Sequence, residues 1–178
     1  EPTQVGASAL ASATPASYSI EVSALASSQS LSTAPGAITD ATNVGAGTLT
    51  ITKAGVAVPI TVADGTSLSA LRDQINAAKA GVAASIVTDA GQPRLVLTGT
   101  DTGLANAVSV AVSGATGQLA ALAYPGSMTQ DRPAADAVVK INGLQISSAS
   151  NKLSGVVDGL TLTLSKVTTA PVQVQRTL

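Results

Sequence analysis

The sequence has 178 residues, a net charge of −1, and no histidine, cysteine, phenylalanine or tryptophan. The missing histidine and cysteine exclude a histidine-based catalytic triad, a thiol nucleophile and a conventional zinc site, and the nine scattered basic residues form no patch that would neutralise nucleic-acid phosphates. Hydrophobic residues make up 45%, but because phenylalanine, tryptophan and cysteine are absent and tyrosine occurs twice, the core must be built from Val, Leu, Ile and Ala. Together with a charged fraction of only 11%, this composition favours an extracellular bacterial β-protein.

The N-terminal third of the chain predicts an arm followed by a strand. Residues 1–16 mix Ala, Ser, Thr and Pro without a period, as in a linker or an irregular arm. From Ser17 to about Ala26 apolar and polar residues alternate, which predicts a strand. The SSQSLST that follows can prolong this strand along an exposed edge. Pro35-Gly36 then marks a break, and residues 38–47 read as a polar crossing.

A hairpin is predicted next. Leu49 and Ile51 alternate with threonines, Ala54-Gly55 makes a tight turn, and residues 56–62 form the return strand. Pro59 lies within that return strand and cannot donate a backbone hydrogen bond, so the strand should be an edge strand or carry a bulge.

One segment has the pattern of an amphipathic helix. Apolar residues at steps of three and four give it one buried stripe, with Thr66 or Ser67 as the N-terminal cap and Asp64-Gly65 as the turn before it. Gly81 is expected as the left-handed residue that ends the helix. The stripe consists of Leu68, Leu71, Ile75 and Ala78.

Beyond the helix the period changes from 3.6 to 2, and short strands follow one another. Asn142-Gly143 is the strongest hairpin turn signal in this part. Residues 117–124 fit either a short helix or a loop, and Ser154–Asp158 can form one helical turn. The predicted strands are 82–88, 94–98, 108–112, 137–141, 144–147, 160–164 and 172–175.

These elements predict a mainly β protein with an α+β insertion. Residues 17–40 and 129–178 are expected to form one discontinuous antiparallel β domain. It would be interrupted by a strand-hairpin, helix and hairpin domain at 41–128, because the two Pro/Gly-rich breaks lie near these boundaries.

No residue is predicted to be catalytic, cofactor-binding or metal-binding. The acidic residues are dispersed, and those in turns are expected to make local hydrogen bonds. Sequence spacing indicates no catalytic partner for Ser85, Ser154 or Ser165. Gly45-Ala46-Gly47 is interpreted as a turn into a strand, because no further glycine or lysine completes a nucleotide-binding loop. The turn acids are Asp40, Asp64, Asp89, Asp101 and Asp158.

Asn76 is unusual because asparagine is a poor helix former. It is interpreted as a tolerated surface residue or as a structural hydrogen-bonding group that reaches the loop before Gly81. Neither alternative is catalytic.

Three sequence blocks resemble known flagellar proteins. Residues 71–77 (LRDQINA), 81–85 (GVAAS) and 94–98 (RLVLT) stand in the order and spacing of the "IN-motif" unit of flagellar hook-associated proteins and flagellins. Residues 13–31 are similar to the opening of the central region of the flagellar filament-capping family, hook-associated protein 2. Residues 136–164, with Asn142-Gly143 and GVVDGLTLTL, resemble that family's second block.

The resemblance implies a structural role without enzymatic activity or cofactors. These residues would be head domains of the cap at the flagellum tip, outside the cell, without the helical coiled-coil legs. The implied partners are flagellin, hook-associated proteins and further copies of the chain in a ring, with host mucin as a further candidate partner. Export through the flagellar type III channel fits the absence of cysteine and of a signal peptide. No stretch approaches the length of a membrane span.

Two rival interpretations stay open at the sequence level. The first is another hook-associated protein or a flagellin outer domain that shares the IN unit. The second is a surface adhesin that binds host glycans, which the near absence of aromatic residues disfavours, since Tyr18 and Tyr124 are the only ones.

Overall fold

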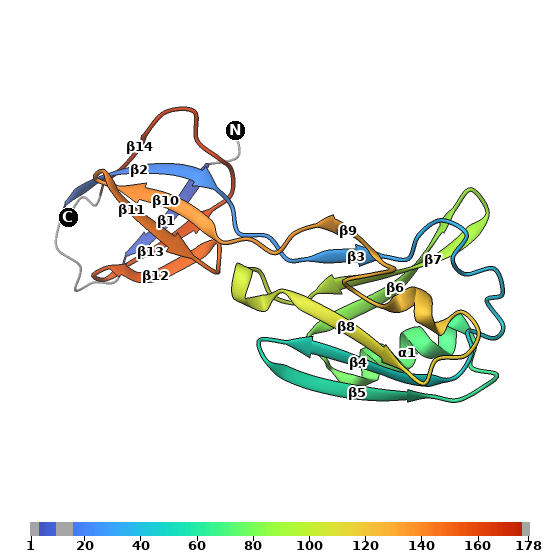
Figure 1. The fold of residues 1–178 in the computed structure, drawn as a ribbon. Coiled ribbons are helices and arrows are strands. Elements are labelled where there is room, and N and C mark those ends of the chain that lie inside the picture. The colour runs from blue at the N-terminus through green and yellow to red at the C-terminus, as the bar shows by residue number, and fades with distance from the viewer. Residues whose placement is uncertain (1–3, 10–15, 176–178) are drawn as a thin grey trace. The chain divides into compact units, whose positions relative to one another are not determined.

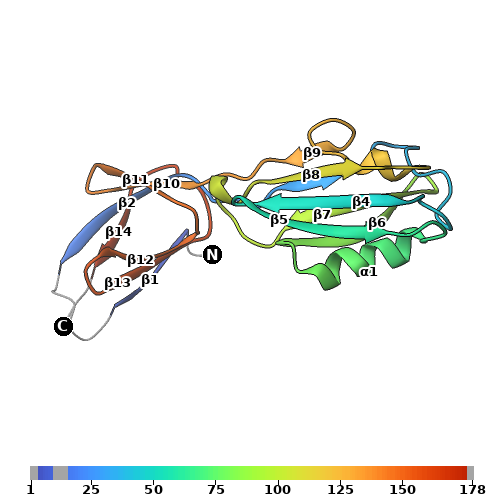
Figure 2. The same ribbon diagram turned by 60° about the horizontal axis from the view of Figure 1, so that its bottom comes forward.

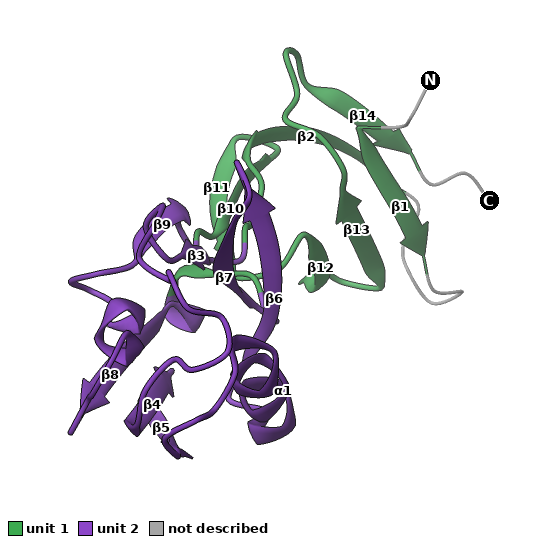
Figure 3. Cartoon of the chain, turned by 90° about the vertical axis from the view of Figure 1, so that its right-hand side faces the viewer, with its two compact units in different colours: residues 1–27, 102–104, 135–178 green, residues 28–101, 105–134 purple. Residues whose placement is uncertain are grey.

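Antiparallel β-sheet dominates the computed structural model, which describes residues 4–9 and 16–175 (Figure 1). Within these residues α1 is the one α-helix, so the predicted fold class is confirmed. The described residues divide into two compact units (Figure 3). Those of 1–27, 102–104 and 135–178 form unit 1, and those of 28–101 and 105–134 form unit 2.

Unit 1 is built from two antiparallel sheets that share one core, in the strand orders β1-β13-β12 and β11-β10-β2-β14. Alternate residues of both sheets are buried, among them Ile20, Val139 and Leu162. The strands are β1 (Val5–Ala9), β2 (Ser17–Ala24), β10 (Ala137–Ile141), β11 (Leu144–Ser148), β12 (Lys152–Val157), β13 (Leu160–Leu164) and β14 (Val172–Gln175).

Two predictions in unit 1 are wrong. Residues 5–9, expected in the arm, form β1 and pair with β13 because burial of Val5 ties them to the core. The remaining arm residues, 1–3 and 10–15, lie outside the described residues. The helical turn expected at Ser154–Asp158 is strand β12 instead, with a register shift between Ser154 and Val157 where Gly155 has a φ of +75°.

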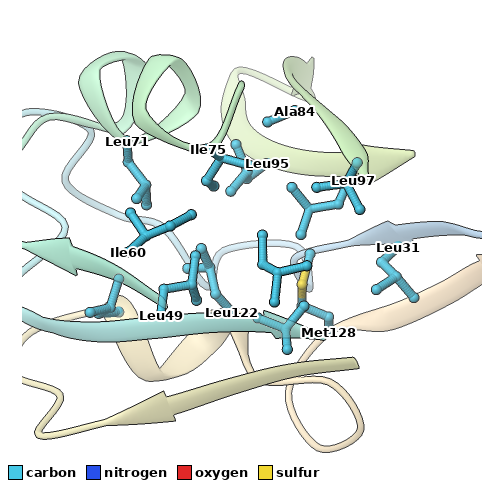
Figure 4. Packing of buried hydrophobic residues seen from close by; sticks show 14 of the residues in the cluster. Leu31, Leu49, Ile60, Leu71, Ile75, Ala84, Leu95, Leu97, Leu122 and Met128 are labelled. Atoms are coloured by element: carbon cyan, nitrogen blue, oxygen red, sulfur yellow. The ribbon is translucent and has the colours of Figure 1, made fainter. Parts of the chain in front are cut away.

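Unit 2 has two further antiparallel sheets, β5-β4-β8 and β6-β7-β3-β9, around a larger core (Figures 1 and 4). In Figure 4 Leu49 and Ile60 of one sheet lie opposite Leu95 and Leu97 of the other. The strands are β3 (Ser30–Ser32), β4 (Gly47–Lys53), β5 (Val56–Val62), β6 (Val82–Asp89), β7 (Gln92–Gly99), β8 (Val108–Ser113) and β9 (Thr129–Arg132).

The helix α1 (Leu68–Ala78) contacts β5 and β6, the end strands of the two sheets (Figure 2). The Ser67 hydroxyl accepts the Ala70 N–H at 3.1 Å, which confirms the predicted cap. The left-handed residue that ends the helix is Lys79, with a φ of +50°, two residues before the predicted Gly81. Its buried residues Leu68, Leu71 and Ile75 are those of the predicted stripe, whereas Ala78 is only partly buried.

The hairpin turns were predicted correctly. Ala54-Gly55 joins β4 to β5 and Asn142-Gly143 joins β10 to β11, each with two positive φ angles, as a type I′ turn requires. Pro59 lies in β5, which is an end strand as expected. Residues 117–124, which fitted either a helix or a loop, contain the 3-10 helix η2 (Leu119–Leu122).

The observed units differ from the predicted domain boundaries at two segments. Residues 28–40 and 129–134 were expected in the discontinuous β domain and belong to unit 2. There β3 pairs with both β7 and β9, so SSQSLST forms an inner strand with buried Leu31 and not an exposed edge. A short segment, Thr102–Leu104, also returns to unit 1.

The two ends of the inserted unit are held together at the boundary. Ser27 and Ala135, both in unit 1, exchange two backbone hydrogen bonds of 2.9 and 3.1 Å. The insertion therefore begins and ends at one β-bridge, and the Gly103 N–H of the returning segment donates to the same Ser27 carbonyl at 3.2 Å.

Candidate interaction surfaces

The acidic side chains do not gather into a site in the described part of the chain, where no three of them are close enough to hold a metal ion. Asp40 makes the local bond expected of a turn aspartate, since it accepts the backbone N–H and the hydroxyl of Thr42. The Thr42 hydroxyl is the main reason that the pKa of Asp40 is lowered. Asp64 accepts from the Asn43 amide at 3.1 Å.

Two turn aspartates form ion pairs, and not only the local hydrogen bonds that were expected. Asp101 pairs with Lys53, and this bond, together with that from Thr100, holds the pKa of Asp101 below its ordinary value. Asp89 pairs with Arg94 at 3.2 Å. Lys53 lies 48 residues before Asp101 in the sequence, and Arg94 lies across the β6–β7 hairpin from Asp89. Sequence spacing alone does not reveal either pair.

Arg94 is the most extensively bonded charged side chain of unit 2. Its Nε donates to the Thr33 carbonyl at 2.8 Å and one terminal nitrogen donates to the Ser32 hydroxyl at 2.7 Å. With the Asp89 pair, the guanidinium therefore fastens β7 to β3. It also lines an open groove of about 310 Å³ beside Val87, Val96 and Asp131.

A second hollow, of about 290 Å³, is mainly apolar and lies where the β4–β5 hairpin meets the end of α1. Val56, 66% exposed at the hairpin tip, is its most prominent apolar group, with Lys53 and Lys79 beside it. A smaller hollow in unit 1 is lined by Tyr18, Leu160 and Val174. Hollows of this kind suit contacts with another protein surface more than enclosure of a small ligand.

The serines singled out in the sequence lie apart. Ser85 is exposed on β6 and Ser154 on β12, while Ser165 follows β13. Ser85 lies in a sheet of unit 2, whereas Ser154 and Ser165 lie on or after paired strands of unit 1, so the three do not form one constellation.

Side-chain amides bind backbone groups at three places, in the manner of a neighbouring peptide. Asn76 accepts the Ala84 N–H at 2.7 Å and donates to the Ala84 carbonyl at 3.0 Å. Asn151 makes the same pair of bonds with Ala26, at 2.7 and 2.9 Å. The prediction of a structural hydrogen bond for Asn76 is confirmed in kind, but its partner lies beyond Gly81 and not before it.

The third amide organises residues 38–47. Gln118 bonds to both Thr39 and Asp40 through Oε1, and its Nε2 donates to the carbonyls of Asp40 and Asn43 at 3.0 and 3.1 Å. Because Gln118 lies some 75 to 79 residues away in sequence, no local signal identified it.

Gly45 allows the segment of residues 38–47 to lie close to the loop that contains Thr116. Its φ is +96°, and a Cβ there would lie 2.0 Å from the Thr116 carbonyl oxygen. The Gly45-Ala46-Gly47 segment thus leads into β4 as predicted, and the glycine is required by backbone packing.

Comparison with known proteins explains this arrangement. Residues 42–101 match the family described as the flagellin hook IN motif, and residues 134–177 match the C-terminus of flagellar hook-associated protein 2. The D2-D3 domains of the flagellar cap protein FliD from Escherichia coli superpose with a TM-score of 0.86 at 32% identity, covering 98% of this chain and 96% of that one. The chain belongs to the FliD family.

Other relatives agree. The FliD D2-D3 domains from Serratia marcescens give a TM-score of 0.90 at 28% identity, with 98% of this chain and all of that chain covered. The B-type flagellar hook-associated protein 2 of Pseudomonas aeruginosa is 36% identical over 92% of this chain and 38% of its own length. That of Escherichia coli K12 is 37% identical over 77% of this chain and 32% of its own length. The chain thus spans about a third of these curated relatives.

The family matches coincide with the observed units. The IN-motif match covers β4, β5, α1, β6 and β7 of unit 2, whereas the C-terminal match covers β10 to β14 of unit 1. In this FliD chain the region matched to the IN motif contains Asn76, the residue that bonds to the edge of β6. No helix in residues 4–9 and 16–175 combines the length and apolarity needed to cross a bilayer.

Proposed function

We propose that this chain forms the head domains of a flagellar filament cap at the flagellum tip, outside the cell. It acts there by contact with flagellin, with hook-associated proteins and with further copies of itself, and not by catalysis. The observation that carries the proposal is the near-complete mutual coverage with the D2-D3 domains of flagellar cap proteins. The whole cap protein's assembly and partners are part of this proposal.

The surface chemistry supports a role in protein contacts. Only 11% of the residues are charged, and the exposed faces carry mostly Ser, Thr and Ala. Contacts made by such faces depend on shape and hydrogen bonding more than on long-range charge. Binding of flagellin to the head domains should therefore change little between low and moderate salt.

A chimera tests the proposal directly. In the Escherichia coli cap protein, this chain replaces the D2-D3 domains, and the chimera is expressed in a strain that lacks its own cap protein. If the heads work as proposed, the chimera restores filaments, measured by electron microscopy, while a protein with no head domains does not. A chimera that is exported and folded but leaves filament length at the level of the headless protein contradicts the proposal.

We also propose that units 1 and 2 are separate folding domains, with unit 2 inserted into unit 1. The bonded pair of Ser27 and Ala135 supports this, since such an insertion costs little loop entropy when its ends are close. Limited proteolysis should cut mainly at the joins of the two units, near residues 27–28, 101–105 and 134–135. A single protected core without cuts there contradicts separate domains.

Host-glycan binding is not added to the proposal. Tyr18 is partly buried beside Val174, and the Tyr124 hydroxyl bonds to Gln130 while its ring packs against the core of unit 2. Neither ring offers the open aromatic platform on which sugars stack.

A further inference from the structure

The outer edge of β6 is a long strand edge of unit 2 with little protection in its sequence. β6 is an end strand, eight residues long, and Asp89 at its last position is its only charged residue. Long edge strands with few charges tend to pair with strands of other molecules, so soluble proteins protect them. In the other sheet of unit 2, the end strand β5 contains Pro59, which removes one backbone donor. β6 contains no proline.

The pairing of β6 defines which groups face outward. Ala84 lies opposite Leu97 of β7, and residues of an antiparallel strand direct their N–H and C=O groups alternately toward and away from the partner. The Ala84 groups point away from β7, because both bond to Asn76. Ile86 and Thr88 share this outward side by alternation.

Asn76 reaches this edge from α1. Its Oδ1 accepts the Ala84 N–H at 2.7 Å and its Nδ2 donates to the Ala84 carbonyl at 3.0 Å. A neighbouring antiparallel strand would offer the same pair of bonds, through the C=O and the N–H of one residue. The side-chain amide of Asn76 therefore occupies the place where an added strand would bond to Ala84.

The bonds at the two ends of β6 do not face this edge. The Gly81 carbonyl accepts from the N–H and the hydroxyl of Thr100, which follows β7, and Asp89 pairs with Arg94 of β7. On the outer side α1 packs against β6, and the bonds described between α1 and the strand backbone are those of Asn76.

We propose that the amide of Asn76 acts as a strand surrogate, here called the Asn76 clamp, that closes the outer edge of β6 to strand addition. The partner that it excludes is an extended strand, and in a purified sample this is β6 of a second copy of the chain. The inference does not depend on the proposed cap function, because it concerns the edge of one sheet.

The test compares two asparagines that make the same bonds in different places. Asn76→Ala removes the pair at the β6 edge, whereas Asn151→Ala removes the equivalent pair at Ala26, which lies outside the named strands. Sedimentation or light scattering over a concentration series of the 178-residue chain gives the self-association constant. For Asn76→Ala it should rise about tenfold or more over wild type, and for Asn151→Ala it should stay near wild type.

A second substitution identifies the associating surface. Ser85 is exposed on β6, so Ser85→Lys in the Asn76→Ala background places like charges near each other in a β6–β6 pair and should restore the wild-type constant. If Asn76→Ala does not associate more than Asn151→Ala, or if Ser85→Lys has no effect on its association, the clamp is not an edge-closing device.

Amide hydrogen exchange tests the clamp in the unmodified chain and does not require that any variant fold. The Ala84 N–H should exchange about tenfold or more slowly than the Thr88 N–H on the same outward side of β6. Equal exchange rates for the two groups overturn the proposal.

Discussion

Units 1 and 2 share one architecture but differ in size. Each has two antiparallel sheets around an aliphatic core, but among the described residues the buried cluster of unit 2 has 20 members and that of unit 1 has 11. Unit 2 adds α1 and η2 to its strands, whereas unit 1 buries its core with strands alone. A smaller core leaves a smaller margin of stability, so single side-chain bonds to the backbone matter more in unit 1.

Unit 1 contains several such bonds between side chains and the backbone. The buried Thr168 hydroxyl accepts the Val22 N–H at 2.9 Å, and the Thr168 N–H donates to the Val22 carbonyl at 3.0 Å. Asn151 holds Ala26 in the same way. These bonds attach loops to β2 and to the chain that follows it, as Gln118 attaches residues 39–43 within the larger core of unit 2.

The largest effect should come from truncation of the two cores. Ile75→Ala in unit 2 and Ile20→Ala in unit 1 each remove a fully buried side chain and should lower the free energy of unfolding of their own unit by about 2–5 kcal/mol. Urea unfolding followed by residue-resolved NMR measures both units. As a control, Val56→Ala at an exposed site should change stability by less than about 0.5 kcal/mol. Equal loss in both units after either substitution would break the comparison.

Gly45→Ala should cause the next largest loss of stability. The added methyl would meet the Thr116 carbonyl at 2.0 Å and the residue would hold a φ of +96°, so we expect a loss of about 2–4 kcal/mol in unit 2. Gly36→Ala is the matched control, since its φ of +71° carries a strain of only about 1 kcal/mol and no atom lies within 4 Å. Thermal unfolding of both variants separates steric clash from backbone strain. Equal losses of stability in Gly45→Ala and Gly36→Ala would show that the loop around Thr116 moves to accommodate the added methyl group.

Thr168→Val tests the dependence of unit 1 on single bonds. The Val22 N–H would stay buried without its acceptor, which should lower the stability of unit 1 by about 1–3 kcal/mol. Thr163→Val, at an exposed position of β13, controls for β-branched replacement of a threonine. Chemical denaturation of the two variants measures the difference, and equal midpoints would remove the distinction drawn between the units.

The smallest effect concerns pH and unit 2. Because Lys53 and Thr100 lower the folded-state pKa of Asp101 below its ordinary value of 3.8, the carboxylate contributes stability above pH 3.8, and that contribution is lost as the pH falls through the lower folded pKa. Asp101→Asn should therefore lower the urea midpoint of unit 2 slightly at pH 7 and not at pH 2. Asp73→Asn, whose partner Arg72 is its sequence neighbour, is the control. An equal effect of Asp101→Asn at both pH values contradicts the assignment.

The local elements were predictable because their signals are local. The apolar stripe and the Thr66-Ser67 cap signal identified α1, and the dipeptides Ala54-Gly55 and Asn142-Gly143 identified the turns, in which these residues have positive φ angles. Pro59 indicated an edge strand, since proline cannot donate to a sheet ladder. In each case the residues that cause the structure are neighbours in the sequence.

The missed features depend on distant partners. β1 is a strand only because β13 pairs with it across more than 150 residues, and SSQSLST is an inner strand because β7 and β9 flank it. Arg94 and Gln118 bind backbone groups of segments 61 to 79 residues away. Composition and period carry no information on such pairings, so the unit boundaries near residues 28–40 and 129–134 were placed wrongly.

The Ser27–Ala135 bridge also has a mechanical meaning. Tension applied to the chain on the two sides of unit 1 passes through the strands of that unit. The paired backbones of Ser27 and Ala135 carry the load across the base of the insertion. The Gly103 N–H also donates to the Ser27 carbonyl at 3.2 Å, and the Leu104 N–H donates to the Asp136 carboxylate at 2.7 Å. The load therefore meets these bonds of unit 1 before it reaches the inserted residues beyond them.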